Sequence, residues 1–180
     1  MDIIFVRHGV PDYMLSDSRK MSQLEKDYSP LNRDYLDEIQ DTANKIKQLN
    51  PDVIISSPYT RALQTAELIN RNVKLDLFVE HDLREWRADL AGEFLPLTER
   101  DHRWHEYREA LKEGKPQTDK PYESSKELKA RVSKVLGKYK QYSKIIVVSH
   151  LNVLESLIGY QDKELQCGHY RPLILANIGD

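Results

Sequence analysis

Three short apolar runs limit the folds open to this chain more than any other feature. The runs cover residues 3–6, 53–55 and 145–148, and each is continuous rather than alternating between apolar and polar side chains. A continuous run is typical of a strand whose two faces are both covered, as in a parallel sheet between two layers of helices. We therefore expect these segments to form the centre of a parallel sheet.

Helical patterns lie between these runs. Apolar side chains recur at helical spacing over residues 36–49, 62–69, 128–139 and 151–159. Weaker strand candidates are residues 73–79 and 173–175. Strands that alternate with helices predict an α/β fold, a three-layer sandwich with a mostly parallel central sheet flanked by helices.

Residues 86–122 interrupt this alternation. They hold both tryptophans, Trp86 and Trp104, among many charged residues and several helix-breaking residues. We interpret the segment as an insertion that is helical around residues 98–113. The length of 180 residues suits one domain, so we expect a single domain over residues 1–180 that carries this insertion.

Charge and cysteine content narrow the possible partners. The chain has 27 basic and 29 acidic residues, and a net charge of −2 argues against bulk electrostatic binding to nucleic acid or an anionic membrane. The single cysteine, Cys167, excludes an internal disulfide and a multi-cysteine metal site. Because no apolar run reaches the length of a membrane span and the start lacks a signal-peptide pattern, we expect a cytoplasmic protein. The oligomeric state is left open.

Polar clusters follow all three strongest strand candidates. Arg7, His8 and Gly9 follow the first run, residues 56–61 follow the second and include Arg61, and Ser149-His150 follows the third. In an open α/β sheet, ligands bind outside the carboxyl ends of the strands. We therefore expect two histidines and two arginines to meet at one edge of the sheet.

This combination favours an anion site. Guanidinium groups match the oxygens of phosphate or carboxylate, whereas their charge opposes a metal ion, and no carboxylate accompanies the clusters. Nearby positive charge also keeps a histidine neutral and nucleophilic near pH 7. The clusters thus predict phosphoryl transfer to an imidazole nitrogen, without a metal or a cofactor.

The clusters resemble, in the same order, the signatures of the histidine phosphatase superfamily, also called phosphoglycerate mutase-like. The most specific segment covers residues 57–66 and reads Ser-Pro-Tyr-Thr-Arg-Ala-Leu-Gln-Thr-Ala. The resemblance runs from residue 2 to about residue 158, and it implies the phosphoglycerate mutase-like fold.

The resemblance also implies roles for individual residues. His8 is the nucleophile that becomes phosphorylated, and Arg7, Arg61 and His150 line the phosphate pocket. Glu85 occupies the place of the family's proton donor, after the third strand candidate in chain order, residues 73–79. The implied activity is that of a metal-independent phosphatase acting on a phosphorylated small molecule or a phosphoprotein.

Two other functions remain open alongside the phosphatase. One is a phosphoglycerate mutase-type phosphotransferase, and the other is a regulator that binds phosphate without turnover. A pure binder needs no nucleophile and acid together, which argues against the regulator. Met14 and Leu151 stand where mutases commonly have Asn and Gly, so we favour the phosphatase.

Two of the candidate residues have competing interpretations. Glu85 has acidic neighbours, Glu80, Asp82 and Glu93, and an ordinary solvated carboxylate is the alternative to a proton donor. For Ser57 we favour a cap on the following helix over a contact with phosphate.

Overall fold

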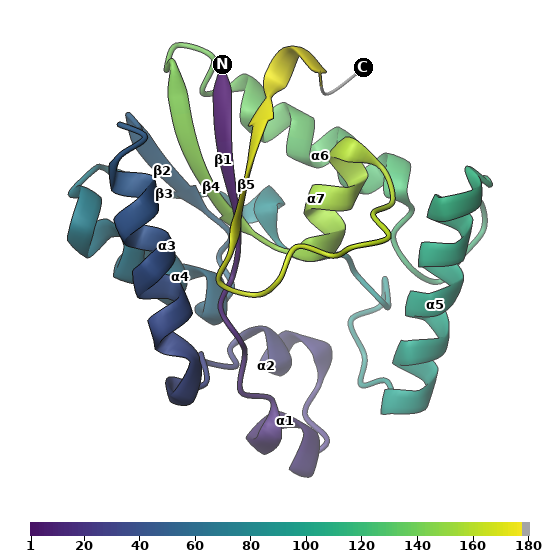
Figure 1. Ribbon diagram of the computed structural model, residues 1–180. Helices are drawn as coiled ribbons and strands as arrows, with labels where there is room; N and C mark the ends of the chain where they lie inside the picture. The colour runs from purple at the N-terminus through teal and green to yellow at the C-terminus, as the bar shows by residue number, and fades with distance from the viewer. Residues whose placement is uncertain (178–180) are drawn as a thin grey trace.

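The computed structural model describes residues 1–177, and its centre is a five-stranded sheet (Figure 1). The strands are β1 (Asp2–Arg7), β2 (Val53–Ser56), β3 (Leu77–Val79), β4 (Lys144–Ser149) and β5 (Tyr170–Ile174). They are arranged in the order β3-β2-β4-β1-β5, and only the edge strand β5 is antiparallel to its neighbour among them. The predicted α/β fold with a mostly parallel central sheet is confirmed.

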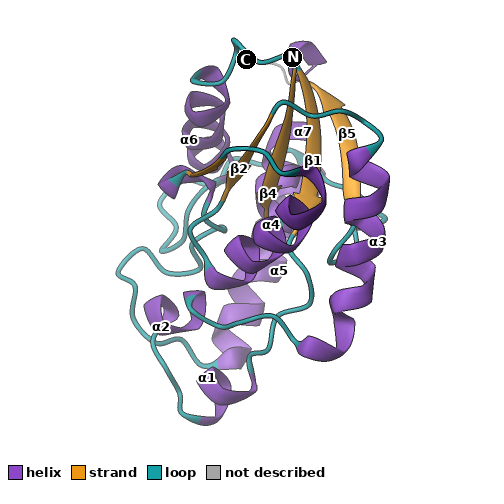
Figure 2. Ribbon diagram, turned by 90° about the vertical axis from the view of Figure 1, so that its left-hand side faces the viewer, coloured by secondary structure: helices purple, strands orange, loops and turns teal. Residues whose placement is uncertain are grey.

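Helices cover both faces of the sheet, which is why its central strands are apolar throughout. The four helices are α3 (Leu36–Lys47) and α4 (Thr60–Val73) on one face, and α6 (Ser125–Gly137) and α7 (Leu151–Ile158) on the other (Figures 1 and 2). Within β1, Ile4 and Val6 pack in the cluster of α3 and α4, whereas Ile3 and Phe5 pack in the cluster of α6 and α7. The predicted three-layer sandwich is therefore confirmed.

The four helices predicted between the strands all form, and local signals set their ends. The clearest case is α6, where Ser124 and Glu127 make a capping box: the Ser124 hydroxyl accepts from the Glu127 amide, and the Glu127 carboxylate accepts from the Ser124 amide at 2.9 Å. The helix consequently begins at Ser125, earlier than the apolar stripe alone predicts. This start fixes the positions of the residues along α6.

The two weaker strand predictions are partly wrong. In residues 73–79, Val73 still belongs to α4, and Lys74 ends that helix in the left-handed conformation with φ of 57°. The strand begins only after this turn, as β3. In residues 173–175, Leu175 already belongs to a 3-10 turn, and β5 extends the other way because its residues pair with β1.

Further helices lie outside the three layers. The predicted helix around 98–113 forms as α5 (Leu97–Glu113), and it packs through Tyr107, whose ring lies 4.9 Å from that of Trp86. Two short helices, α1 (Met14–Ser18) and α2 (Gln23–Asp27), were not predicted, and they lie on the side of the sheet where the parallel strands end (Figure 1). None of the helices in the described part of the chain has the length and apolar character needed to cross a lipid bilayer.

Candidate active site

Three chain segments meet at the carboxyl edge of the sheet. His8 follows β1, Arg61 lies in the first turn of α4 after β2, and His150 follows β4. The rings of His8 and His150 lie 5.0 Å apart between centroids, and Arg61 Nε lies 3.3 Å from His8 Nε2. Because β4 lies between β1 and β2, these segments are neighbours at this edge.

The environment of His8 favours a neutral ring with a lone pair on Nε2. The side chain is buried, and Nδ1 lies 2.7 Å from the carbonyl oxygen of Gly9. A carbonyl only accepts, so Nδ1 carries the proton and Nε2 keeps its lone pair, toward which Arg61 Nε donates. Burial lowers the pKa of His8 well below its usual value, and the charges of Arg61 and Arg7 lower it further.

The turn after His8 is held by α4. The Gly9 amide donates to Thr65 Oγ1 at 2.9 Å, and that hydroxyl donates to the Arg61 carbonyl at 2.7 Å. A Cβ on Gly9 would lie 2.5 Å from Cδ1 of Ile39 on α3. A side chain at residue 9 would therefore crowd Ile39. The hydrogen bonds through Thr65 fix the turn after His8 relative to Arg61.

Arg61 is a buried cation that forms no ion pair with the described residues. Its side chain is 4% exposed, and its guanidinium lies 4.9 Å from the Tyr59 ring centroid and 5.7 Å from that of Tyr13. Within residues 1–177, no carboxylate forms an ion pair with it. A buried, unpaired charge is costly, and an anionic ligand would offset that cost.

His150 is held by a serine for which we predicted another role. Its Nε2 lies 2.7 Å from Ser57 Oγ, and its Nδ1 is buried without a hydrogen-bond partner among the described residues. Burial lowers the pKa of His150 well below its usual value, and the positive charge of Arg61 lowers it further. The predicted helix cap at Ser57 is wrong, because α4 has its N-cap at Tyr59 without a side-chain cap, and the hydroxyl contacts His150 instead.

Arg7 reaches the same edge but is anchored on its other side. Its Nη1 donates to the Leu165 carbonyl at 2.7 Å and to Glu164 Oε2 at 3.3 Å. Its Nε is buried and has no hydrogen-bond partner in the described part of the chain. This nitrogen and His150 Nδ1 are both buried without a hydrogen-bond partner among the described residues, and both could bind an anion together with Arg61.

Glu85 lies in the loop after β3 and faces the same arginines. Its side chain is half-buried, and Oε1 accepts a hydrogen bond from the Trp86 amide at 2.7 Å. Burial raises the pKa of Glu85, although the Trp86 amide and the charges of Arg61, Arg7 and Arg131 oppose that shift. A carboxyl with a raised pKa is suited to donate a proton.

The neighbouring carboxylates are occupied elsewhere or exposed. Glu80 pairs with Lys138 at 2.7 Å, Asp82 pairs with Arg84 at 2.7 Å, and Glu93 is exposed. Of these acidic side chains, Glu85 is therefore the one that combines burial with proximity to the arginines of the site.

Sequence reasoning missed another carboxyl near Arg61, that of Asp27 on α2, which is buried. Its side chain accepts from Gln23 Nε2 at 3.2 Å and from the Tyr59 hydroxyl, and burial raises its pKa to about 6. The same Tyr59 ring lies 5.1 Å from that of His150 and contacts Arg61. No signal in the sequence identified Asp27, because residues 14–27 carry no long apolar pattern.

Within the described residues, no group of three or more potential ligands could hold a metal ion.

Comparisons with known proteins identify the family to which this chain is similar. The family model described as histidine phosphatase superfamily (branch 1) matches residues 3–178. The Bacillus subtilis (strain 168) protein named "Uncharacterized phosphatase PhoE" is 30% identical over 183 residues, covering 98% of this chain and 86% of that protein. The resemblance predicted from the three clusters is confirmed.

Solved structures of phosphatases share the fold. A mycobacterial glucosyl-3-phosphoglycerate phosphatase in complex with inorganic phosphate has a TM-score of 0.70 at 19% identity, covering 98% of this chain and 92% of that chain. The α-ribazole phosphatase of Shigella flexneri has a TM-score of 0.62 at 20% identity, covering 96% of this chain and 89% of that chain. These likenesses confirm the predicted phosphoglycerate mutase-like fold.

Proposed function

The chain belongs to the histidine phosphatase superfamily, and on that premise we propose that it hydrolyses a phosphomonoester through a phosphohistidine intermediate on His8. One observation carries the proposal: the lone pair of His8 Nε2 lies beside the buried, unpaired guanidinium of Arg61. A neutral imidazole next to an anion-binding group is what attack on a phosphate requires.

In the first step, His8 Nε2 attacks phosphorus. A P–N bond forms while the P–O bond to the leaving group breaks. Arg7, Arg61 and His150 donate hydrogen bonds to the non-bridging oxygens, and Arg7 Nε and His150 Nδ1 are free to do so among the described residues. Glu85, which burial favours in its protonated form, gives its proton to the departing oxygen.

In the second step, water hydrolyses the phosphohistidine. Glu85, now a carboxylate, takes a proton from the attacking water, whose oxygen forms a bond to phosphorus while the P–N bond breaks. Inorganic phosphate leaves, and both His8 and protonated Glu85 are restored. The cycle balances without a metal ion or a redox cofactor, and we propose that the enzyme uses neither.

The substrate class follows from the site and from the relatives together. We propose a phosphorylated small molecule or a phosphoprotein, handled in the cytoplasm. The names of the solved relatives include a glucosyl-3-phosphoglycerate phosphatase and an α-ribazole phosphatase, so sugar-linked and nucleoside-like phosphomonoesters belong in the first substrate panel.

Trapping the intermediate tests the proposal. The enzyme is mixed with 4-nitrophenyl phosphate, denatured within milliseconds at alkaline pH, and mapped by mass spectrometry for a phosphorylated histidine. We expect phosphate on His8, and none in the His8→Ala variant. Phosphate found only elsewhere, or full activity of His8→Ala, would contradict the mechanism.

A second measurement separates hydrolysis from phosphate transfer. The enzyme is incubated with 3-phosphoglycerate, and released phosphate and 2-phosphoglycerate are both followed by NMR. We expect no isomerisation that outruns phosphate release. The opposite result would identify a mutase-type phosphotransferase.

A further inference from the structure

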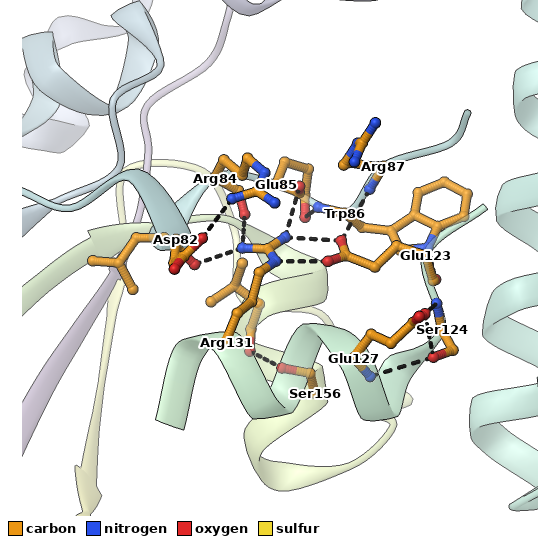
Figure 3. A network of polar contacts seen from close by, with 12 residues as sticks. Asp82, Arg84, Glu85, Trp86, Arg87, Glu123, Ser124, Glu127, Arg131 and Ser156 are labelled. Atoms are coloured by element: carbon orange, nitrogen blue, oxygen red, sulfur yellow. Dashed lines mark hydrogen bonds and ion pairs between the residues drawn. The ribbon is translucent and has the colours of Figure 1, made fainter. Parts of the chain in front are cut away.

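The loop that carries Glu85 lies outside the sheet, and side chains bind several of its backbone groups. Residues 84–90 belong to no helix or strand. The carbonyls of Asp82 and Arg84 accept hydrogen bonds from Arg131 Nη1 at 2.5 and 2.8 Å, and the Glu85 carbonyl accepts from Nη2 at 3.0 Å. A single guanidinium from α6 therefore binds three carbonyls around the candidate acid (Figure 3).

A buried carboxylate holds that guanidinium in place. Glu123 accepts from Arg131 Nε at 2.6 Å and from Nη2 at 2.8 Å, so the ion pair is bidentate. The two side chains are only 10% and 7% exposed. Together with the three carbonyls, these contacts use all five N–H groups of Arg131.

Glu123 also binds the loop directly. The Trp86 indole donates to the Glu123 carbonyl at 2.6 Å, and the Glu123 amide donates to the Arg87 carbonyl at 3.0 Å (Figure 3). On the other side of Glu85, the Leu83 carbonyl accepts a hydrogen bond at 2.7 Å from the hydroxyl of Ser149, the last residue of β4. The backbone on both sides of the acid is thus fixed to α6 and to the central sheet.

The carboxyl of Glu85 itself is held much less than its backbone. Among residues 1–177, the Trp86 amide is the one group that donates a hydrogen bond to it. The position of the carboxyl therefore depends on the backbone from which it projects, and Arg131 binds that backbone at three carbonyls.

We propose that Arg131 and Glu123 form a positioning pair for the catalytic acid. Arg131 fixes the backbone of Glu85, and Glu123 balances the charge of Arg131 so that the acid can keep its proton. Neither side chain touches the reacting atoms. The inference rests on the proposed role of Glu85 in leaving-group protonation.

Electrostatics explains why the anchor is an ion pair rather than an arginine alone. Three cations face Glu85 from different elements, Arg7 from β1, Arg61 from α4 and Arg131 from α6, and each lowers its pKa against the effect of burial. The charge of Glu85 also acts on four other titratable groups and raises the pKa of each: Tyr13, Tyr59, Tyr107 and Glu155. Without Glu123, the charge of Arg131 would act on the acid unbalanced and favour the carboxylate.

The first test is the leaving-group dependence of Arg131→Lys, which keeps the charge but loses the planar set of donors. We expect kcat/KM to fall about tenfold or more for an alkyl phosphate, whose leaving oxygen needs the acid, and less than about threefold for 4-nitrophenyl phosphate. In a Glu85→Gln background, Arg131→Lys should cause no further selective loss. Equal losses for both substrates would overturn the inference.

A matched control is available on α5. Arg103 is 15% exposed, pairs with Asp89 at 2.9 Å, and donates to the Ala88 carbonyl at 2.9 Å, further along the same loop. Arg103→Lys disturbs the same kind of contact away from the acid, so the ratio of alkyl to aryl activity should stay at the wild-type value. A change as large as that of Arg131→Lys would show that general loosening of the loop is responsible.

The second test is the pH profile of kcat/KM for the alkyl phosphate, measured for two variants with opposite charge changes. Glu123→Gln leaves Arg131 unbalanced, which lowers the pKa of Glu85, so activity should be lost at lower pH than in the wild type. Arg131→Met leaves the negative charge of Glu123 unbalanced, which raises the pKa of Glu85. The loss of activity with rising pH should therefore occur at higher pH than in the wild type. Shifts in one direction, or no shift in folded variants, would contradict the inference.

Failure of the inference and failure of the proposed function give different results. If His8 is phosphorylated normally but Arg131→Lys slows alkyl and aryl phosphates alike, the positioning role is wrong and the phosphatase mechanism stands. If His8→Ala is fully active, the mechanism itself fails. Circular dichroism and thermal unfolding of each variant identify any that do not fold, and Glu123→Gln, which keeps the shape of the side chain, then provides the decisive profile.

Discussion

Ser57 Oγ lies 2.7 Å from His150 Nε2, so a hydrogen bond joins the segments that follow β2 and β4 inside the candidate site. The Tyr59 amide donates to the same hydroxyl at 3.3 Å, which leaves the hydroxyl proton for His150. If Ser57 donates to Nε2, the proton of neutral His150 must be on Nδ1, the atom that can then donate to a phosphate oxygen.

Ser57→Ala should therefore weaken phosphate binding through the tautomer of His150. We expect kcat/KM to fall by up to about tenfold, the effect of one lost neutral hydrogen bond. Ser56→Ala is the matched control, because Ser56 is equally buried and donates to the Ser57 carbonyl at 3.0 Å, away from both histidines. Nitrogen NMR of the His150 ring reports the tautomer, and an Nε2-protonated ring in the wild type would contradict this explanation.

Arg61→Ala should impair catalysis strongly, because the transferred phosphoryl group would lose a buried charged donor. A loss of about 10²-fold or more in kcat/KM, roughly 2.7 kcal/mol, is expected for such a group. Arg61→Lys should recover only part of it, since lysine supplies charge without the planar fork. Steady-state kinetics on 4-nitrophenyl phosphate provide the measurement, and near-wild-type values for the alanine variant would remove Arg61 from the site.

Glu85→Gln should slow poor leaving groups selectively. General acid catalysis contributes about 10²–10⁴-fold for an alkyl phosphate and little for an activated aryl phosphate. Because a raised pKa keeps the acid protonated to higher pH, wild-type kcat/KM for the alkyl substrate should fall as pH rises through that pKa, and the variant should lose this limb. If both substrates slow equally, another group is the acid.

The central sheet and four residues of the candidate site could be anticipated from the sequence because their signals are local. Each of β1, β2 and β4 is a continuous apolar run followed by its polar cluster, and parallel pairing alone brings the clusters together. The short helices α1 and α2 could not be anticipated, since five-residue helices are unstable alone and depend on tertiary contacts. One such contact is the ion pair of buried Lys26 with Asp17 at 2.5 Å.

The role of Ser57 was missed for a related reason. A serine shortly before a helix is a good local candidate for a cap, but its actual partner, His150, is far away in the sequence. Which of the two contacts forms depends on the register of β2 against β4, where Ser56 lies opposite Val148. Local patterns do not contain that register.

Gly9→Ala should destabilise the fold through α3 as well as reduce activity. The new methyl group would lie 2.5 Å from Ile39 Cδ1, and overpacking of this kind costs about 1–3 kcal/mol. Ile39→Val removes that atom at a cost of about 0.5–1.5 kcal/mol by itself. We expect the double variant to be more stable than the sum of the two single changes, as measured by urea unfolding, whereas simple additivity would show that the contact does not limit this position.

Asp27 should make the stability of the protein depend on pH in an unusual direction. Its folded-state pKa, about 6, lies above the ordinary aspartate value of 3.8, so the folded state binds more protons between these values. The contribution of Asp27 to stability is therefore present below pH 3.8 and is lost as pH rises through 6. We expect Asp27→Asn to be more favourable relative to the wild type at pH 8 than at pH 4. Urea unfolding at a series of pH values tests this. A wild type and an Asp27→Asn variant whose unfolding free energies run parallel from pH 4 to pH 8 would show that Asp27 titrates as an ordinary surface carboxylate.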